Sequence, residues 1–266
     1  MTRALGHVIF IGAGPGAADL ITVRGARLLA SADVVLFDAL TDPALRELAP
    51  HAAWVHVGKR GFCDSTGQTA INALLVKHAQ AGKVVVRLKG GDPSVFGRLE
   101  EELEALAQAG IECEVVPGVT AAIGAAAATQ RPLTRRGGGR SVSLTTAMTR
   151  EGALRASRSA DTEVFYMAGK QLAALSRRLI AAGWPADTPA SVVSRAGWPD
   201  QLHSDHTVDS LGRASMLHAG RPTVVTVGAG AVPIASSAAA SAQQDQRPHA
   251  PAMGTDAPAV EPRGKP

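Results

Sequence analysis

Residues 84–101 read VVVRLKGGDPSVFGRLEE, and this stretch decides the fold. The β-branched apolar run at its start predicts a buried strand over residues 83–88. Gly90 and Gly91 follow the strand, and glycines allow the backbone to turn tightly or to approach a ligand closely. The segment 98–109 is rich in Glu, Leu and Ala, which favour a helix. The stretch therefore predicts a strand, a glycine-lined loop and a helix in direct succession.

The same order of elements repeats through the first half of the chain. Predicted strands occupy residues 8–11, 33–37, 54–57, 83–88 and 114–116, and predicted helices occupy residues 22–31, 42–49, 68–81, 98–109 and 121–128. This alternation, with short connections, is typical of an α/β protein with a parallel sheet. Because ligands bind beyond the carboxyl ends of parallel strands, we expect the five loops after these strands to meet at one binding edge.

A second α/β set is predicted beyond the polar, glycine-rich stretch 131–139. Its expected strands lie at 141–144, 163–167, 190–194 and 223–227, and its expected helix lies at 171–182. We therefore divide the chain into an N-terminal α/β domain (1–133), a C-terminal α/β domain (134–233) and a disordered tail (234–266). The tail is dominated by Ala, Ser, Gln and Pro, so it has too little apolar surface to offset its ordering entropy.

Composition limits the classes of function. Of 266 residues 45% are hydrophobic, enough for a sizeable core, but only 3% are aromatic, which argues against a base-stacking nucleic-acid surface. The net charge of +4 is spread along the chain and suits an acidic small-molecule substrate. No apolar run approaches a membrane span, and the first residues lack the pattern of a signal peptide. We expect a cytoplasmic protein that binds neither nucleic acid nor membrane.

Cysteine and histidine patterns point away from metal and triad chemistry. Cys63 and Cys113 are the two cysteines, and neither belongs to a CxxC or lies at metal-ligand spacing from a histidine. A disulfide framework or a structural zinc site is therefore not expected. The histidines are scattered without a nucleophile nearby, so a Ser-His-Asp or Cys-His triad has no support.

The loop after the first predicted strand reads GAGPGA, residues 12–17. With Asp38 ending the next strand, it matches the dinucleotide-binding fingerprint. Pro15 stands inside the loop, however, and AADLIT delays the helix, so a tight turn alone also explains the pattern. A nicotinamide-dependent oxidoreductase is thus one alternative, and a non-catalytic ligand-binding protein is another.

Charged residues cluster near the predicted strand ends and the inter-domain stretch. They are Lys59, Arg60, Arg98, Arg131, Arg135 and Arg136, together with Glu101. Arginine side chains bind carboxylates through two parallel hydrogen bonds, so this set around one cleft would suit a substrate with several carboxylates. Taken one at a time, each of these residues is more simply explained as a solvated surface charge. Glu101 also stands three residues after Arg98, where the two can pair on a helix face.

Nine segments occur in the order seen in the class III, tetrapyrrole-type methyltransferases, which this chain resembles over about residues 6–230. They are GAGPG (12–16), FDAL (37–40), VGKR (57–60), INALLV (71–76), VVRLKGGDPSVFGR (85–98), EVVPGVTAA (114–122), RPLTRR (131–136), VFYMAGKQL (164–172) and TVVTVG (223–228). The resemblance implies two α/β domains, S-adenosylmethionine (SAM) bound in the cleft between them, a tetrapyrrole substrate, a homodimer and no metal. A sibling methylase acting on a later corrin precursor is the nearest alternative.

The resemblance also assigns roles to individual residues. It implies SAM contacts at Pro15, Gly90, Gly91, Asp92, Val95, Thr120, Ala121, Met167 and Ala196. Asp38 and Lys59 match the positions of a proton acceptor and donor, and Arg98, Glu101 and Arg136 match positions that engage the tetrapyrrole or assist deprotonation. An arginine is a poor base at its usual pKa, so a carboxylate or water is favoured as the proton acceptor. The chain departs from the usual family residues at Ala17, Phe37, Ser94, Leu99 and Ala168.

Overall fold

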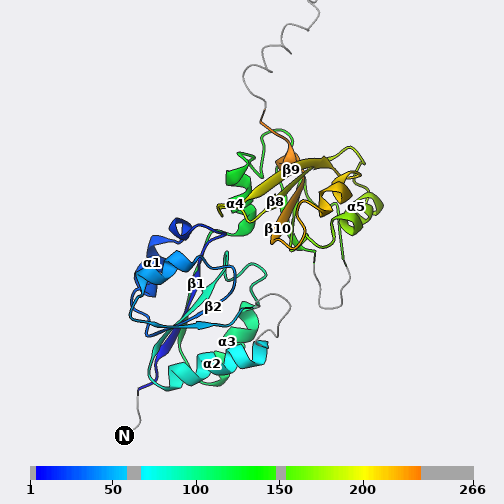
Figure 1. Ribbon diagram of the computed structural model, residues 1–266. Coiled ribbons are helices and arrows are strands. Elements are labelled where there is room, and N and C mark those ends of the chain that lie inside the picture. Colours follow the sequence, from blue (N-terminus) through cyan, green and yellow to red (C-terminus); the bar gives the residue numbers. More distant parts are fainter. Residues whose placement is uncertain (1–3, 59–66, 148–153, 235–266) are drawn as a thin grey trace, which may run out of the picture. The chain divides into compact units, whose positions relative to one another are not determined.

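Two five-stranded sheets organise the computed structural model, which describes residues 4–58, 67–147 and 154–234 (Figure 1). Both sheets belong to one compact unit, residues 1–232. Three sets of expectations lie outside the described residues: those for Lys59 and Arg60, that for Cys63, and that for the tail from residue 235 onward.

The first sheet is parallel throughout and has the strand order β3-β2-β4-β1-β5. Its strands are β1 (His7–Gly12), β2 (Val34–Phe37), β3 (Ala53–His56), β4 (Val84–Lys89) and β5 (Cys113–Val116). The apolar runs of β1, β2 and β4 feed two core clusters, as expected where helices cover both faces of a parallel sheet. The carboxyl ends of all five strands therefore point to one edge, as the sequence predicts.

Helices connect these strands close to the predicted positions. They are α1 (Val23–Leu29), α2 (Gln68–Gln80), α3 (Leu99–Gln108) and α4 (Ala121–Ala128). The short 3-10 helices η1 (Ala18–Leu20) and η2 (Pro43–Leu48) complete this half, so the helix expected at 42–49 is a 3-10 helix. Asp42 caps it by accepting a hydrogen bond from the Ala44 N–H, with Pro43 in the first turn.

The second sheet is mixed, with the order β6-β7-β10-β8-β9. Its strands are β6 (Val142–Thr146), β7 (Thr162–Tyr166), β8 (Pro189–Ser194), β9 (Leu202–Thr207) and β10 (Thr223–Gly228). The pair β6–β7 is parallel and the other three pairs are antiparallel. Helix α5 (Leu172–Ala181) and the 3-10 helices η3 (Leu211–Ser215) and η4 (Ala229–Ala231) accompany it.

Helix α4 belongs to the core of the second sheet. Its buried Ala122 and Ala125 pack in one cluster with Val164 of β7 and Val224 of β10. Residues on both sides of the boundary predicted at 133 therefore contribute to that core.

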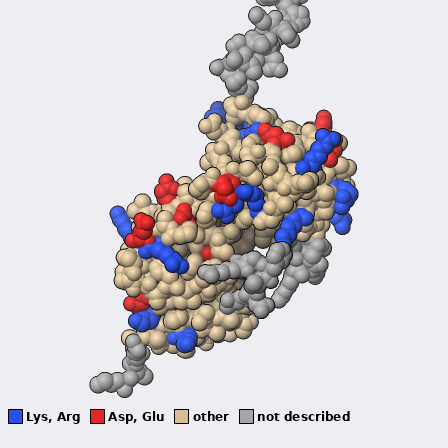
Figure 2. All heavy atoms as spheres, viewed as in Figure 1, with Lys and Arg blue, Asp and Glu red and all other residues tan. Residues whose placement is uncertain are grey.

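Charged side chains of both signs are interspersed on the face shown in Figure 2, without a large area of a single sign. Within the described ranges, no helix is both long and apolar enough to cross a bilayer.

Candidate functional site

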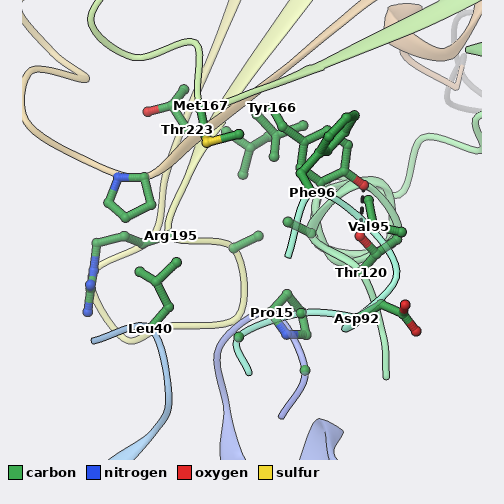
Figure 3. Close-up of a pocket in the computed structure, with 18 of the residues that line it drawn as sticks. Pro15, Leu40, Asp92, Val95, Phe96, Thr120, Tyr166, Met167, Arg195 and Thr223 are labelled. Carbon is green, nitrogen blue, oxygen red and sulfur yellow. Dashed lines mark hydrogen bonds between the residues drawn. The ribbon is translucent and has the colours of Figure 1, made fainter. Parts of the chain in front are cut away.

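A pocket opens at the edge where the strands of the first sheet end, and residues near the ends of β7, β8 and β10 close it from the other side (Figure 3). Loops after β1, β2, β4 and β5 supply Gly14, Pro15, Leu40, Gly90, Gly91, Asp92, Val95, Phe96, Thr120 and Ala121. The second sheet and its loops supply Tyr166, Met167, Val193, Arg195, Ala196, Trp198, Pro222, Thr223 and Val224. All nine residues expected to contact SAM line this pocket.

Glycines bring three loops into backbone contact beneath the pocket. A Cβ added to Gly12 would lie 2.6 Å from the Gly118 Cα and 2.7 Å from the Gly91 carbonyl oxygen, so there is no room for a side chain at Gly12. Gly91 and Gly14 exchange backbone hydrogen bonds of 2.7 and 3.3 Å, and both have φ in the left-handed region. The glycine spacing that suggested a nucleotide loop thus serves close approach of strand ends.

Asp92 ties the loop after β4 to the loop after β5. Its two carboxylate oxygens each accept a 2.8 Å hydrogen bond, one from the Gly118 N–H and one from the Ser94 N–H. Figure 3 shows the carboxylate directed away from the centre of the pocket. Asp92 therefore shapes the pocket through its backbone and its loop contacts.

A tyrosine–threonine pair forms another part of the wall. The hydroxyls of Tyr166 and Thr120 lie 2.8 Å apart, and the Ala122 N–H donates to the tyrosine oxygen at 3.3 Å. Burial raises the pKa of the Tyr166 hydroxyl above its usual value, so it stays protonated at neutral pH. The Phe96 ring packs edge-on against Tyr166 at 5.0 Å between centroids. In the sequence, the available signal for Tyr166 is its place directly before Met167.

Backbone strain concentrates at this pocket. Within the described residues, the non-glycine residues with positive φ are Phe96, Arg98, Gln130, Met167 and Arg195. Three of them, Phe96, Met167 and Arg195, line the pocket. Non-glycine residues in this region cost about 1–3 kcal/mol each and occur preferentially at ligand sites.

Asp38 lies at the end of β2, next to the pocket lining. Its carboxylate accepts hydrogen bonds from the N–H groups of Leu40, at 3.0 Å, and Gly90, at 3.2 Å. Asp38 therefore joins the loop after β2 to the loop after β4. Lys59, its expected partner in proton transfer, lies outside the described residues.

A buried ionic cluster joins strand β4 to helix α3, the two elements on either side of the loop after β4. Glu102 of α3 is fully buried and pairs with Lys89 Nζ at 2.5 Å and with Arg87 Nε at 3.0 Å. Gln68 adds a 3.3 Å hydrogen bond to the same carboxylate. Burial lowers the pKa of Lys89 below its ordinary value, against the opposing effect of Glu102. The signal in the sequence was Arg87 and Lys89 alternating within an apolar strand, which places both on one face.

The Arg98–Glu101 pair is exposed and lies beyond the pocket lining. Arg98 is the N-cap residue of α3, not its first helical residue, and its guanidinium donates two hydrogen bonds to Glu101 at 2.7 and 2.6 Å. These bonds to Glu101 raise the pKa of Arg98 and so favour its charged form. Arg98 lines a neighbouring depression, to which Phe96 also contributes.

We expected Arg131 to lie among the cations around one cleft, and this expectation is wrong. That residue is buried and forms a two-pronged ion pair with Asp205 of β9, while also donating to the Ala231 carbonyl oxygen at 3.0 Å. Arg135 donates to the carbonyl oxygen of Val232. Arg136 is exposed and lies outside the pocket lining. Arg131 therefore links the chain segment after α4 to strand β9 of the second sheet.

The lining of the pocket is typical of a site for a small organic molecule. Its walls are mainly apolar and aromatic side chains, with glycines in the loops of the first sheet. A Cβ at Gly91 would meet no atom closer than 3.9 Å, so the missing side chain leaves open space there. Helix α1 begins only at Val23, which does not place its N-terminus against the glycine loop as the dinucleotide fingerprint requires.

Comparison with known proteins gives consistent matches over most of the chain. The family described as Tetrapyrrole (Corrin/Porphyrin) Methylases matches residues 7–212. Uroporphyrinogen-III C-methyltransferase of Pseudomonas aeruginosa is 42% identical over 84% of this chain and 93% of its own length. Siroheme synthase 2 of Yersinia pestis is 47% identical over 75% of this chain, but the match spans only 43% of that relative.

A solved structure shows the same fold. Uroporphyrin-III C-methyl transferase from Thermus thermophilus, complexed with S-adenosyl homocysteine, matches with a TM-score of 0.73 and 34% identity. The match covers 84% of this chain and 97% of that one.

Proposed function

Because the chain belongs to the family of tetrapyrrole (corrin/porphyrin) methylases, we propose that it is a SAM-dependent C-methyltransferase acting on uroporphyrinogen III. Two successive methylations, at C2 and C7, convert this substrate to precorrin-2 by way of precorrin-1, for sirohaem or cobalamin synthesis. The observation that carries the proposal is that Pro15, the Gly90–Asp92 loop, Thr120 and Met167 line the same pocket.

The pocket supports methyl transfer mainly by alignment and exclusion of water. When bound, SAM supplies a methyl group made electrophilic by its sulfonium. Apolar walls such as Val95, Phe96 and Val193 keep water from this group. The glycine loops let the backbone approach the bound reactants closely, and holding two reactants in the reacting geometry can remove about 7–11 kcal/mol of the barrier. The new bond forms from a pyrrole carbon to the methyl group while the sulfur–methyl bond breaks.

The pyrrole N–H proton must leave to complete each methylation. We assign its acceptance to Asp38 or to water, because Arg98 is held protonated by Glu101. Lys59 is the proposed proton donor. Arg98 and Arg136 are proposed to bind carboxylates of the tetrapyrrole, and Glu101 is proposed to orient Arg98.

The decisive experiment is incubation with uroporphyrinogen III and SAM labelled in its methyl group. We expect two labelled methyl groups per tetrapyrrole in the product, analysed by mass spectrometry. Label transfer to a later corrin precursor, but not to uroporphyrinogen III, would support the sibling methylase. Calorimetry that finds NAD(P) binding without binding of S-adenosyl homocysteine would point to an oxidoreductase instead.

Arg98→Lys tests whether Arg98 binds a carboxylate of the substrate. Lysine keeps the charge but loses the planar fork, so kcat/KM for uroporphyrinogen III should fall about 10- to 100-fold, the effect of losing a charged hydrogen bond. Affinity for S-adenosyl homocysteine should not change. Arg24→Lys is the matched control, because Arg24 forms a comparable exposed pair with Glu114. Unchanged turnover in Arg98→Lys would remove Arg98 from the substrate site.

The proposal extends to a cytoplasmic homodimer. It is supported by an apolar depression along α4 and β6, lined by residues that include Ala126 and Leu133. Ile123 and Leu144 are 52% and 41% exposed and both line this apolar depression, and contiguous apolar surface of this kind marks protein–protein contact sites.

A further inference from the structure

Arg195 holds an unusual position at the end of β8. It lines the pocket, and its backbone φ of 51° lies in the left-handed region that non-glycine residues rarely adopt. Its N–H donates to the Pro222 carbonyl oxygen at 3.0 Å, which joins the ends of β8 and β10. In Figure 3 Arg195 lies on the side of the pocket opposite Thr120 and Asp92. The strained backbone thus places an arginine at the rim of the proposed SAM site.

The guanidinium of Arg195 is fixed by neighbouring groups. It lies 4.2 Å from the centre of the Trp198 ring, and its Nε donates to Asp200 at 2.7 Å. The Trp198 Nε1–H donates in turn to the Pro15 carbonyl oxygen at 3.2 Å, so the ring is held against the loop after β1. A side chain already held in one conformation loses little further entropy when it binds a ligand.

The charges at this rim do not balance. Asp200 is the shared partner of two arginines, because Arg221 Nη1 also lies 3.2 Å from its second carboxylate oxygen. The bond from Arg195 lowers the pKa of Asp200, which therefore stays ionised at neutral pH. Two guanidiniums facing one carboxylate leave one positive charge in excess. Within the described part of the chain, the terminal nitrogens Nη1 and Nη2 of Arg195 donate to no group.

We propose that Arg195, which shares Asp200 with Arg221, binds a carboxylate of a bound ligand at the rim of the pocket. Two free terminal N–H groups on a planar guanidinium match the two oxygens of a carboxylate. The inference rests on the proposed function, which offers two sources of this group. One is the amino-acid carboxylate of SAM, and the other is an acidic side chain of the tetrapyrrole.

Arg195→Gln tests the proposal, because glutamine keeps most of the stem but loses the charge. If the carboxylate belongs to SAM, the Kd for S-adenosyl homocysteine should rise about 10- to 100-fold, while binding of 5′-methylthioadenosine, which lacks that carboxylate, should not change. If it belongs to the tetrapyrrole, the Kd should stay constant and KM for uroporphyrinogen III should rise by a similar factor. Arg195→Lys keeps the charge but loses the planar guanidinium. Its Kd or KM, whichever changes in Arg195→Gln, should lie between the values of the wild type and of Arg195→Gln.

The matched control is Arg158→Gln, since Arg158 also stacks on a tryptophan, at 5.4 Å from the Trp184 ring, but lies outside the pocket lining. An Arg195→Gln protein with unchanged Kd and KM would overturn the carboxylate site and leave the proposed function standing. Equal weakening of S-adenosyl homocysteine and 5′-methylthioadenosine would also overturn it, because the side chain would then only pack against the nucleoside. A wild-type chain that binds no S-adenosyl homocysteine would overturn both.

Discussion

Glu102→Leu should lower the free energy of unfolding by about 3–5 kcal/mol, the usual cost of leaving a buried charge unpaired. Glu102 is fully buried and is the shared partner of Lys89 and Arg87, whose side chains are 4% and 6% exposed. Removing the carboxylate leaves two buried cations facing each other. Urea denaturation at pH 7 measures the change, and we expect a lower midpoint with an unchanged slope.

Two further variants separate charge from packing. Glu104→Leu on the exposed face of the same helix should change stability by no more than about 0.5 kcal/mol. Combining Glu102→Leu with Lys89→Met and Arg87→Leu should recover most of the lost stability, because an apolar replacement of a whole buried ionic cluster is often neutral. A loss below about 1 kcal/mol in Glu102→Leu would contradict a structural role for the cluster.

Gly12→Ala should reduce kcat/KM about 100-fold, because a displacement of the order of 1 Å at a site that aligns two reactants has this effect. The added methyl group would lie 2.6 Å from two backbone atoms of Gly118 and 2.7 Å from the Gly91 carbonyl oxygen. Backbone atoms cannot rotate away, so the loops after β4 and β5 must move away from the end of β1, where Gly12 lies. The affinity for S-adenosyl homocysteine should fall together with turnover, and overpacking should cost about 1–3 kcal/mol of stability.

Gly67→Ala is the matched control for this variant. Gly67 precedes α2, has an ordinary φ of −59°, and a Cβ there would meet nothing within 4 Å. Its kinetics and ligand affinity should match those of the wild type. Retention of wild-type affinity by Gly12→Ala would mean that the crossing of the three loops does not shape the ligand site.

Most elements of the fold follow from local sequence signals. Apolar runs predict β1, β2 and β4, the spacing of apolar residues predicts α2, and helix-favouring composition predicts α3, each within about two residues. Strand β9 is missing from the prediction. Its sequence LHSDHT has one large apolar residue, because an edge strand with polar side chains needs no continuous apolar run.

Glu101 and Glu102, neighbours in α3, show which contacts local sequence signals do not predict. The three-residue spacing from Arg98 draws attention to Glu101, and the structure does pair them, but on the exposed side. Glu102 also stands at helical spacing from Arg98, four residues after it, but the hydrogen bonds of Arg98 go to Glu101. The carboxylate of Glu102 finds other partners. Its partners are Arg87 and Lys89 on β4, and only the packing of α3 against the sheet brings them together.

Neighbouring residues and contiguous motifs account for the α/β class, the parallel order of elements in the first half of the chain and the glycine loops at the strand ends. The residues expected to contact SAM came from the resemblance to the methyltransferase family. Only the tertiary structure decided that Arg131 pairs with Asp205, that Glu102 is buried among cations, and that Arg195 is held at the rim by Trp198 and Asp200. Arg131 and Glu102 find their partners on other elements, and the contact that fixes Trp198 comes from Pro15, far away in the chain. No local periodicity encodes such pairs, because burial and charge balance are properties of the packed chain.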